Sequence, residues 1–222
     1  MSVINVEHIS KLYGDKMILE DLSCSVDEGD KIGIIGINGT GKSTLLRIIA
    51  GEEEADEGKI IFSNGMTIGW MGQNPEFDEE SSILKYVCEG KKIEDDYGYE
   101  SDAKAMLTVL ELENFDEKIK NLSGGQKKRA ALCKVLLQKP DILILDEPTR
   151  GIDVGAKAEI HKIIAAVART GVAVILISSE LPEIIGCVDR TIVLRGGRIT
   201  GEFAGEELDQ NTIMEKAAYT SK

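Results

Sequence analysis

The sequence predicts an α/β fold, with a core of mostly parallel sheet, an antiparallel β edge and a small inserted helical subdomain. Short apolar runs without polar alternation, at 142–145 and 172–177, are typical of parallel strands buried on both faces. Helical patterns at 125–138 and 156–169 precede these runs, as connections between parallel strands require. A third apolar run, at 32–35, leads into a glycine-rich loop and another helix.

The antiparallel edge is predicted from the first part of the chain. Residues 3–8 and 22–27 have the pattern of strands in an edge sheet, and 59–62 and 67–71 are further strand candidates. Near the other end, a strand at 191–194 is followed by a two-glycine turn.

Residues 81–120 differ in character from the sequence around them. Apolar residues recur at helical spacing in 82–88 and in 103–112, and a polar break at 91–98 separates the two patterns. We therefore expect one domain over 1–222, with 81–120 inserted into the α/β core as a small helical subdomain.

Length and composition are those of one large globular domain that can bury a full core. The longest apolar runs are far shorter than the roughly 20 residues of a membrane span, and the first residues lack the features of a signal peptide. The four scattered cysteines are typical of reduced thiols in the cytosol. We expect a cytoplasmic protein, with a peripheral position at the inner face of the cell membrane as the alternative.

The negative charge of the chain is concentrated in one stretch. The net charge is −13, of which residues 52–120 carry −12. Such a surface repels phosphate backbones, so we expect no direct nucleic-acid binding.

The segment 36–44, GINGTGKST, has the pattern of a phosphate-binding loop between a predicted strand and a predicted helix. Glycines let successive backbone N–H groups point at phosphate oxygens, and the helix N-terminus adds its positive dipole end. Lys42 is expected to reach the β- and γ-phosphates, and Ser43 to bind Mg²⁺. An ordinary glycine-rich turn is the alternative. The sequence therefore predicts a P-loop NTPase core, with these candidate ATP-binding residues: Gly36, Asn38, Gly39, Thr40, Gly41, Lys42, Ser43 and Thr44.

Two carboxylates follow the predicted strand 142–145 directly. In an open α/β sheet, ligands gather at the carboxyl ends of the strands. We expect Asp146 to hold Mg²⁺ through its water shell, and Glu147 to orient or deprotonate the attacking water. A solvated pair of loop carboxylates is the alternative.

The segment 122–126, LSGGQ, opens the predicted helix 125–138. Its glycines and serine at a helix N-terminus predict a second anion site, and a short basic run follows. The alternative is a serine N-cap followed by a solvated basic surface. The candidate residues here are Ser123, Gly124, Gly125 and Gln126.

Together, the segments 36–44, 122–126 and 142–148, with Gln73 between the first two, resemble the ATP-binding cassette (ABC) ATPases in the family's order. The resemblance covers essentially the whole chain. It implies an ATP hydrolase that binds ATP and Mg²⁺ and works as a head-to-tail homodimer. In such a dimer the signature segment of one cassette covers the γ-phosphate held by the other.

The same resemblance implies roles for further residues. Tyr13 would stack on adenine, Gln73 would contact Mg²⁺ and the attacking water, and Asp153 would lie at the dimer seam. The alternatives are an ordinary strand aromatic for Tyr13 and a turn residue for Gln73. The catalytic candidates are then Lys42, Gln73, Glu147 and Ser179, and the candidate Mg²⁺ ligands are Ser43, Gln73 and Asp146.

The chain departs from the family after the predicted strand 172–177. The family usually places a γ-phosphate-sensing histidine there, and this chain has Ser179. His8 lies in a predicted strand and His161 in a predicted helix, so neither fills the role by position. A serine can donate a hydrogen bond but cannot become cationic. We therefore expect weakened hydrolysis with ATP binding retained.

The two parts of the chain resemble different branches of the family. Residues 1–149 are similar to the first cassette of ABC-F proteins, the soluble double-cassette branch that acts on ribosomes. Residues from about 149 to 222 are similar to the second cassette of double-cassette monosaccharide-importer ATPases, in which a serine at position 179 is habitual. We hypothesise a chimera, natural or man-made, joined near residue 149.

Three functions follow. The first is an ATPase that dimerises on MgATP and hydrolyses it slowly, the second an ATP-gated binding module with little turnover, and the third a chimera without a natural partner. The importer-like tail favours transport as the coupled process, with a membrane permease as the candidate partner. The ABC-F-like front favours a ribosome.

Overall fold

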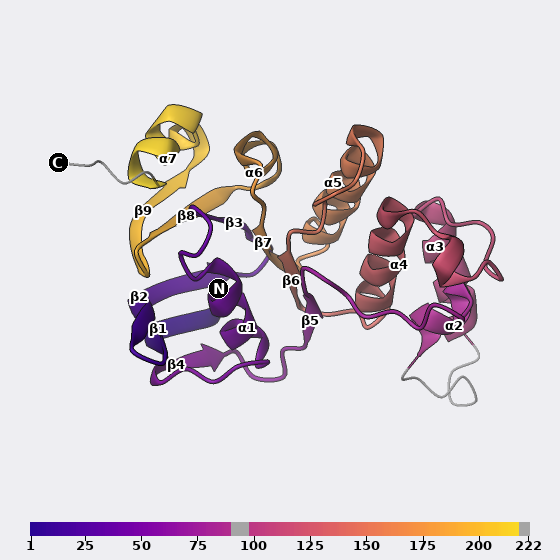
Figure 1. Cartoon of the computed structure of the whole chain (residues 1–222), viewed down its shortest axis with the longest axis horizontal. Helices are drawn as coiled ribbons and strands as arrows, with labels where there is room; N and C mark the ends of the chain where they lie inside the picture. The colour runs from indigo at the N-terminus through magenta and orange to yellow at the C-terminus, as the bar shows by residue number, and fades with distance from the viewer. Residues whose placement is uncertain (90–97, 218–222) are drawn as a thin grey trace.

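The computed structural model describes residues 1–89 and 98–217, whose strands form two sheets (Figure 1). The three-stranded sheet is antiparallel, in the order β2-β1-β4, and the six-stranded sheet has the order β5-β6-β7-β3-β8-β9. Pairs from β5 to β8 are parallel, and β9 runs antiparallel to β8. The strands are β1 (Ser2–Tyr13), β2 (Lys16–Asp27), β3 (Lys31–Ile35), β4 (Glu57–Phe62), β5 (Ile68–Met71), β6 (Ile142–Asp146), β7 (Ala173–Ile177), β8 (Arg190–Arg195) and β9 (Arg198–Ala204).

The predicted α/β class, with its parallel core and antiparallel edge, is confirmed. Every residue of β6 and β7 is buried, as the lack of polar alternation predicted. Along β7, Val174 and Leu176 belong to the hydrophobic cluster that includes the helical side of the molecule. Ile175 and Ile177 belong to the cluster shared with α1 and the three-stranded sheet. The six-stranded sheet is therefore the central layer of the core.

Helices cover the sheets and form a lobe to one side. Figure 1 shows α2, α3 and α4 gathered away from the three-stranded sheet, with α5 between them and the remaining helices. The helices are α1 (Lys42–Ala50), α2 (Ile83–Cys88), α3 (Tyr99–Val109), α4 (Gly124–Leu136), α5 (Val154–Ala168), α6 (Leu181–Cys187) and α7 (Gln210–Ala217), with short 3₁₀ turns η2 (Ile119–Asn121) and η3 (Gly205–Glu207).

The elements follow the predicted order, with shifted ends. Helix α3 begins four residues before the pattern at 103–112, and α4 packs against both α2 and α3. Strand β1 continues to Tyr13, beyond the expected 3–8. Except for Gly98, the polar break at 91–98 lies outside the described residues. Among the helices described, none has the length and apolar character needed to cross a membrane.

Candidate active site

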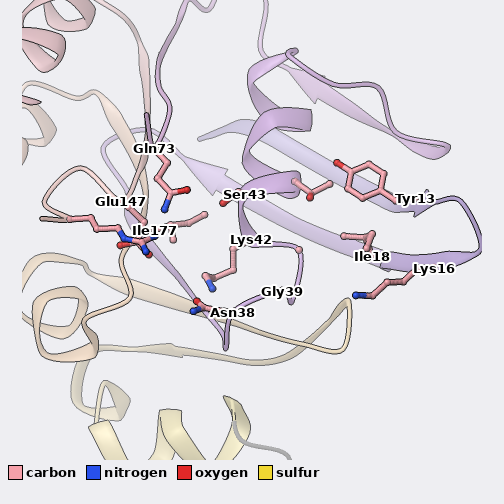
Figure 2. Close-up of a pocket in the computed structure, with 13 residues that line it drawn as sticks. Tyr13, Lys16, Ile18, Asn38, Gly39, Lys42, Ser43, Gln73, Glu147 and Ile177 are labelled. Atoms are coloured by element: carbon pink, nitrogen blue, oxygen red, sulfur yellow. The ribbon is translucent and has the colours of Figure 1, made fainter. Parts of the chain in front are cut away.

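A cleft of about 390 Å³ opens where β3, β6 and β7 end, and Figure 2 shows the side chains around it. The hollow joins residues that are far apart in the sequence, at the edge where a parallel sheet places its ligands. Its lining consists of Tyr13, Lys16, Ile18, Asn38, Gly39, Gly41, Lys42, Ser43, Thr44, Gln73, Glu147, Arg150 and Ile177.

The loop between β3 and α1 needs glycine at two of the predicted positions. A Cβ on Gly36 would lie 2.4 Å from the carbonyl oxygen of Leu194, so no side chain fits there. Gly41 caps α1 with φ 93°, a left-handed conformation that glycine adopts without strain. The backbone can therefore pass close to β8 and still turn directly into the helix.

Thr40 stabilises this loop from behind. Its hydroxyl donates to the carbonyl oxygen of Ile37 at 2.9 Å, and its side chain is buried. Of the predicted phosphate-loop residues, Gly36 and Thr40 are not among those that line the cleft, and the other six are.

The Lys42 ammonium is buried at the floor of the cleft, with 8% of the residue exposed. It donates to the carbonyl oxygens of Gly36, at 2.7 Å, and Ile37, at 3.2 Å. Burial lowers the pKa of Lys42 from its usual range, while Glu147 and Asp146 act in the opposite direction. A cation held only by neutral carbonyls can turn to phosphate oxygens with little competition from its present partners.

Asp146 fits a magnesium ligand. It is 3% exposed, and its Oδ1 is buried without a hydrogen-bond partner among the described residues. Burying a carboxylate oxygen without a partner costs free energy, unless a bound cation or a water molecule interacts with it. Asp146 is not itself among the residues that line the cleft, but Glu147, the next residue along the chain, is. Ser43 and Gln73 line the cleft and offer the oxygen ligands that Mg²⁺ prefers.

Glu147 is held in an unusual backbone conformation at the end of β6. Its φ is 51°, and its N–H donates to the carbonyl oxygen of Ile177 at 3.0 Å. Its Oε2 accepts from the backbone N–H of Ser179 at 3.0 Å and from the Ser179 hydroxyl at 3.1 Å. The structure thus brings the predicted base and the residue at the histidine position into direct contact.

Neither histidine takes part in this contact. The exposed His8 pairs with Asp21 on the three-stranded sheet, at 2.7 Å. His161 on α5 contacts Glu183 on α6 at 2.5 Å, and the Ser178 hydroxyl also bonds to that carboxylate. The segment that carries Ser179 is therefore anchored by a half-buried ion pair that the sequence patterns did not reveal.

The pKa values of this pair are displaced in opposite directions. Burial acts to lower the pKa of His161, but hydrogen bonds to Cys187 and Glu183 and the attraction of Glu183 outweigh it and raise the pKa to about 9. Burial acts to raise the pKa of Glu183, but hydrogen bonds from His161, Ser178 and Thr149 lower it to about 2. The pair is therefore ionised at neutral pH.

The signature segment caps its own helix. The Ser123 hydroxyl accepts from the backbone N–H of Gln126 at 3.2 Å, and the Gln126 side chain accepts from the backbone N–H of Ser123 at 2.9 Å. Gly125 lies against Ile152, which a Cβ would approach to 3.1 Å. None of residues 123–126 is among the described residues that line the cleft.

Tyr13 and Asp153 occupy positions compatible with the roles that the resemblance implied. Tyr13 is 44% exposed at the end of the cleft away from Glu147, and its hydroxyl donates to Glu53 at 2.7 Å (Figure 2). Asp153 is the N-cap of α5, accepting from the Ala156 N–H at 3.0 Å. That N–H bond and its neighbours lower the pKa of Asp153.

Four lining residues were not predicted as site residues: Lys16, Ile18, Arg150 and Ile177, the last of which ends the predicted strand 172–177. Lys16 and Ile18 follow Tyr13 around the turn between β1 and β2, and Arg150 follows Glu147 by three residues. Lys16 and Ile18 could not be predicted as site residues, because a single charged or branched side chain at the end of a strand forms no recognisable sequence motif.

The model of a known family, described as ABC transporter, matches residues 19–150. The chain belongs to this family. It is an ABC-type ATPase domain, and its predicted enzyme class is confirmed.

Curated relatives carry sugar-importer names. The chain is 36% identical to the ribose import ATP-binding protein RbsA 2 of Mesorhizobium japonicum, over 90% of this chain and 44% of the relative. It is 32% identical to the galactose/methyl galactoside import ATP-binding protein MglA 1 of Photobacterium profundum, over 90% of this chain and 46% of the relative. The chain thus spans about half the length of the curated relatives it matches.

Solved structures of ATP-binding cassettes have the same fold. A nucleotide-free cassette from an ABC transporter superposes with a TM-score of 0.85 at 28% identity, covering 96% of each chain. The ADP conformation of another cassette gives a TM-score of 0.83 at 28% identity, covering 97% of this chain and 96% of that one.

Proposed function

We propose that this ABC domain binds MgATP in the cleft and hydrolyses it as a head-to-tail homodimer. In that dimer, residues 123–126 of one copy cover the γ-phosphate bound by the other. One observation carries the proposal. Lys42, Ser43, Gln73 and Glu147 meet in one cleft, whereas the signature segment of the same copy lies outside its lining.

Each cleft residue has a distinct role in this proposal. The phosphate-loop N–H groups and Lys42 hold the β- and γ-phosphates, and the Tyr13 ring lies where it can stack on adenine. Ser43, Gln73 and Asp146 hold Mg²⁺, which, when bound, neutralises phosphate charge. Gln73 also orients the attacking water, and Asp153 lies at the dimer seam.

Glu147 acts as the base. It accepts a proton from the water whose oxygen bonds to the γ-phosphorus, while the bond from that phosphorus to the bridging oxygen breaks and leaves ADP and inorganic phosphate. Two hydrogen bonds from Ser179 already occupy Oε2 of this carboxylate, so they compete with the attacking water for that oxygen. This contact supports slow turnover, and it favours the ATP-gated binding module as the second candidate function.

We propose monosaccharide import as the coupled process, with the domain held peripherally by a membrane permease. The support is the importer names of the relatives, which include ribose and galactose or methyl galactoside. The ABC-F resemblance of residues 1–149 and the chimera remain hypotheses. One relative, named as a ribose import ATP-binding protein, matches 97% of this chain and so covers both sides of residue 149. This match argues against a junction at that position.

The test is steady-state MgATP hydrolysis over a wide range of protein concentration, in the parent chain and in Glu147→Gln. Dimeric catalysis predicts that the rate rises faster than linearly with concentration in the parent and disappears in the variant. A strictly linear rate would contradict the dimer. ATP binding without hydrolysis in either protein would support the binding module.

A further inference from the structure

A second hollow, of about 520 Å³, adjoins the ATP cleft. Among the described residues, Gln73, Asn74, Lys128 and Arg150 line it. Gln73 and Arg150 also line the ATP cleft, so the two spaces are neighbours that share a wall. Two cations and two side-chain amides make up the lining, without a carboxylate.

Lys128 points from the second turn of α4 to the loops that carry the reaction. Its ammonium donates to the main-chain oxygen of Gln73 at 2.5 Å and lies 3.4 Å from that of Glu147. Burial lowers the pKa of Lys128, Asp146 and Glu147 act to raise it, and Arg150 again lowers it. An ammonium has three donors, and no ion pair of Lys128 is found in the described part of the chain.

The neighbouring Lys127, unlike Lys128, has a carboxylate partner within the described ranges 1–89 and 98–217. It forms an ion pair with Glu79 at 2.8 Å on the outer side of α4. Arg150, by comparison, is exposed and lines the hollow, and it forms no ion pair among the residues described. Lys128 and Arg150 repel each other, although Asp146 and Glu147, which do not line the hollow, attract Lys128 more strongly. Among the described residues, no negative side chain lines the hollow itself. An anion between them would relieve this repulsion.

We propose that this hollow is a subsite for inorganic phosphate, which receives the product as it leaves the ATP cleft past Gln73 and Arg150. The inference rests on the proposed ATP hydrolysis for the source of the phosphate. Phosphate fits better than a nucleotide because the lining offers cations and amide donors but no apolar or aromatic surface for a base.

The test is equilibrium binding of radiolabelled inorganic phosphate to the full chain loaded with MgADP. In Lys128→Gln the amide can still donate to the two carbonyls, but the charge is gone. Lys128→Arg keeps the charge, and Lys127→Gln removes a charge one residue away. We expect Lys128→Gln to weaken phosphate binding about tenfold or more. We expect both other variants to stay within about twofold of the parent.

ADP affinity, measured in the same samples, distinguishes a failure of the proposed function from a failure of the phosphate subsite. If the parent chain does not bind MgADP, the proposed function itself fails. If MgADP binds equally in all four proteins and phosphate binding is absent or indifferent to Lys128→Gln, the subsite alone is overturned. A parallel loss of ADP and phosphate affinity in Lys128→Gln would also overturn it, since Lys128 would then act on the nucleotide site.

Discussion

The phosphate loop and the signature segment are both glycine-rich stretches that enter a helix, yet the structure uses them differently. In the loop, Lys42 is buried beside Asp146 and Glu147, and its hydrogen bonds go to loop carbonyls that phosphate can replace. In the signature segment, Ser123 and Gln126 hydrogen-bond to each other in a capping box, and neither is among the described residues that line the cleft. The first region contributes side chains to the cleft of its own copy, whereas under the proposed dimer the second region contacts the nucleotide of the other copy.

The comparison implies that nucleotide binding belongs to one copy and hydrolysis to two. Variants of the cleft and of the signature segment can therefore separate effects on binding from effects on turnover. Under the proposed dimer, the loop should control both, and the signature segment only turnover.

The largest effect is expected from Glu147→Gln. Removing the base should lower the hydrolysis rate by about 100-fold or more, because general-base catalysis contributes that much. ATP affinity should hold, since the amide still accepts from Ser179. Phosphate-release kinetics and calorimetric titration measure the two quantities. Glu159→Gln, in an exposed ion pair on α5, is the matched control. Equal rates in the two variants would remove Glu147 from the mechanism.

Lys42→Ala should act on binding itself. The ammonium makes charge-assisted hydrogen bonds to phosphate, so its loss should weaken MgATP binding by roughly 10- to 100-fold. Lys31→Ala, at the opposite end of β3 and paired with Asp189, should leave binding within about twofold. A fluorescent ATP analogue titrated into both proteins provides the measurement. Unchanged affinity in Lys42→Ala would mean that the loop does not hold the phosphates.

The pair of His161 and Glu183 should make stability depend on pH. The pKa of His161 is about 9 in the folded chain, above the roughly 6.5 expected when unfolded, so its contribution is complete below pH ~6.5 and is lost as pH rises through about 9. The pKa of Glu183 is about 2, so its contribution is present above pH ~4.5 and lost as pH falls towards 2.

Urea unfolding at pH 6.5 and pH 9.5 tests this sign. The parent chain should lose on the order of 2 kcal/mol more than His161→Gln between the two pH values, because the variant has no proton to release. Cys187, a free cysteine whose side chain also acts to raise the pKa of His161, should be kept reduced throughout. An equal loss of unfolding free energy in both proteins would mean that other groups cause the fall in stability at alkaline pH.

Ser123→Ala should have the smallest effect on binding. It removes one bond of the capping box, which costs about 1 kcal/mol of stability, and should leave monomeric ATP affinity within about twofold. Hydrolysis should fall, because the serine would face the γ-phosphate of the other copy. Ser82→Ala removes the N-cap of α2 and is the matched control, with hydrolysis preserved. An equal loss of turnover in both would assign the effect to helix capping alone.

Sequence patterns predicted most of the fold because its core strands carry one strong signal. Residues 142–145 and 173–177 are apolar throughout, and runs of this length are typical of parallel strands buried on both faces. The phosphate loop was equally predictable, since glycine is required where the chain meets Leu194 and where φ is positive.

What sequence patterns missed depends on contacts between distant residues. Three contacts join segments that only the folded sheet brings together. They are the hydrogen bonds from Ser179 to Glu147, the His161–Glu183 pair and the hydrogen bond from Lys128 to Gln73. The end of strand β1 was also predicted wrongly. Strand β1 continues to Tyr13 because its backbone pairs with β2 as far as that residue, which the local sequence pattern does not reveal.

The most direct test of the division between the regions is complementation. Lys42→Ala damages the phosphate loop and Ser123→Arg damages the signature segment, so each homodimer should be inactive. Mixing them in equal amounts gives heterodimers with one intact composite site, and we expect about a quarter of the parent's hydrolysis to return. No recovery, with both proteins folded and Ser123→Arg still binding MgATP, would contradict the head-to-tail arrangement.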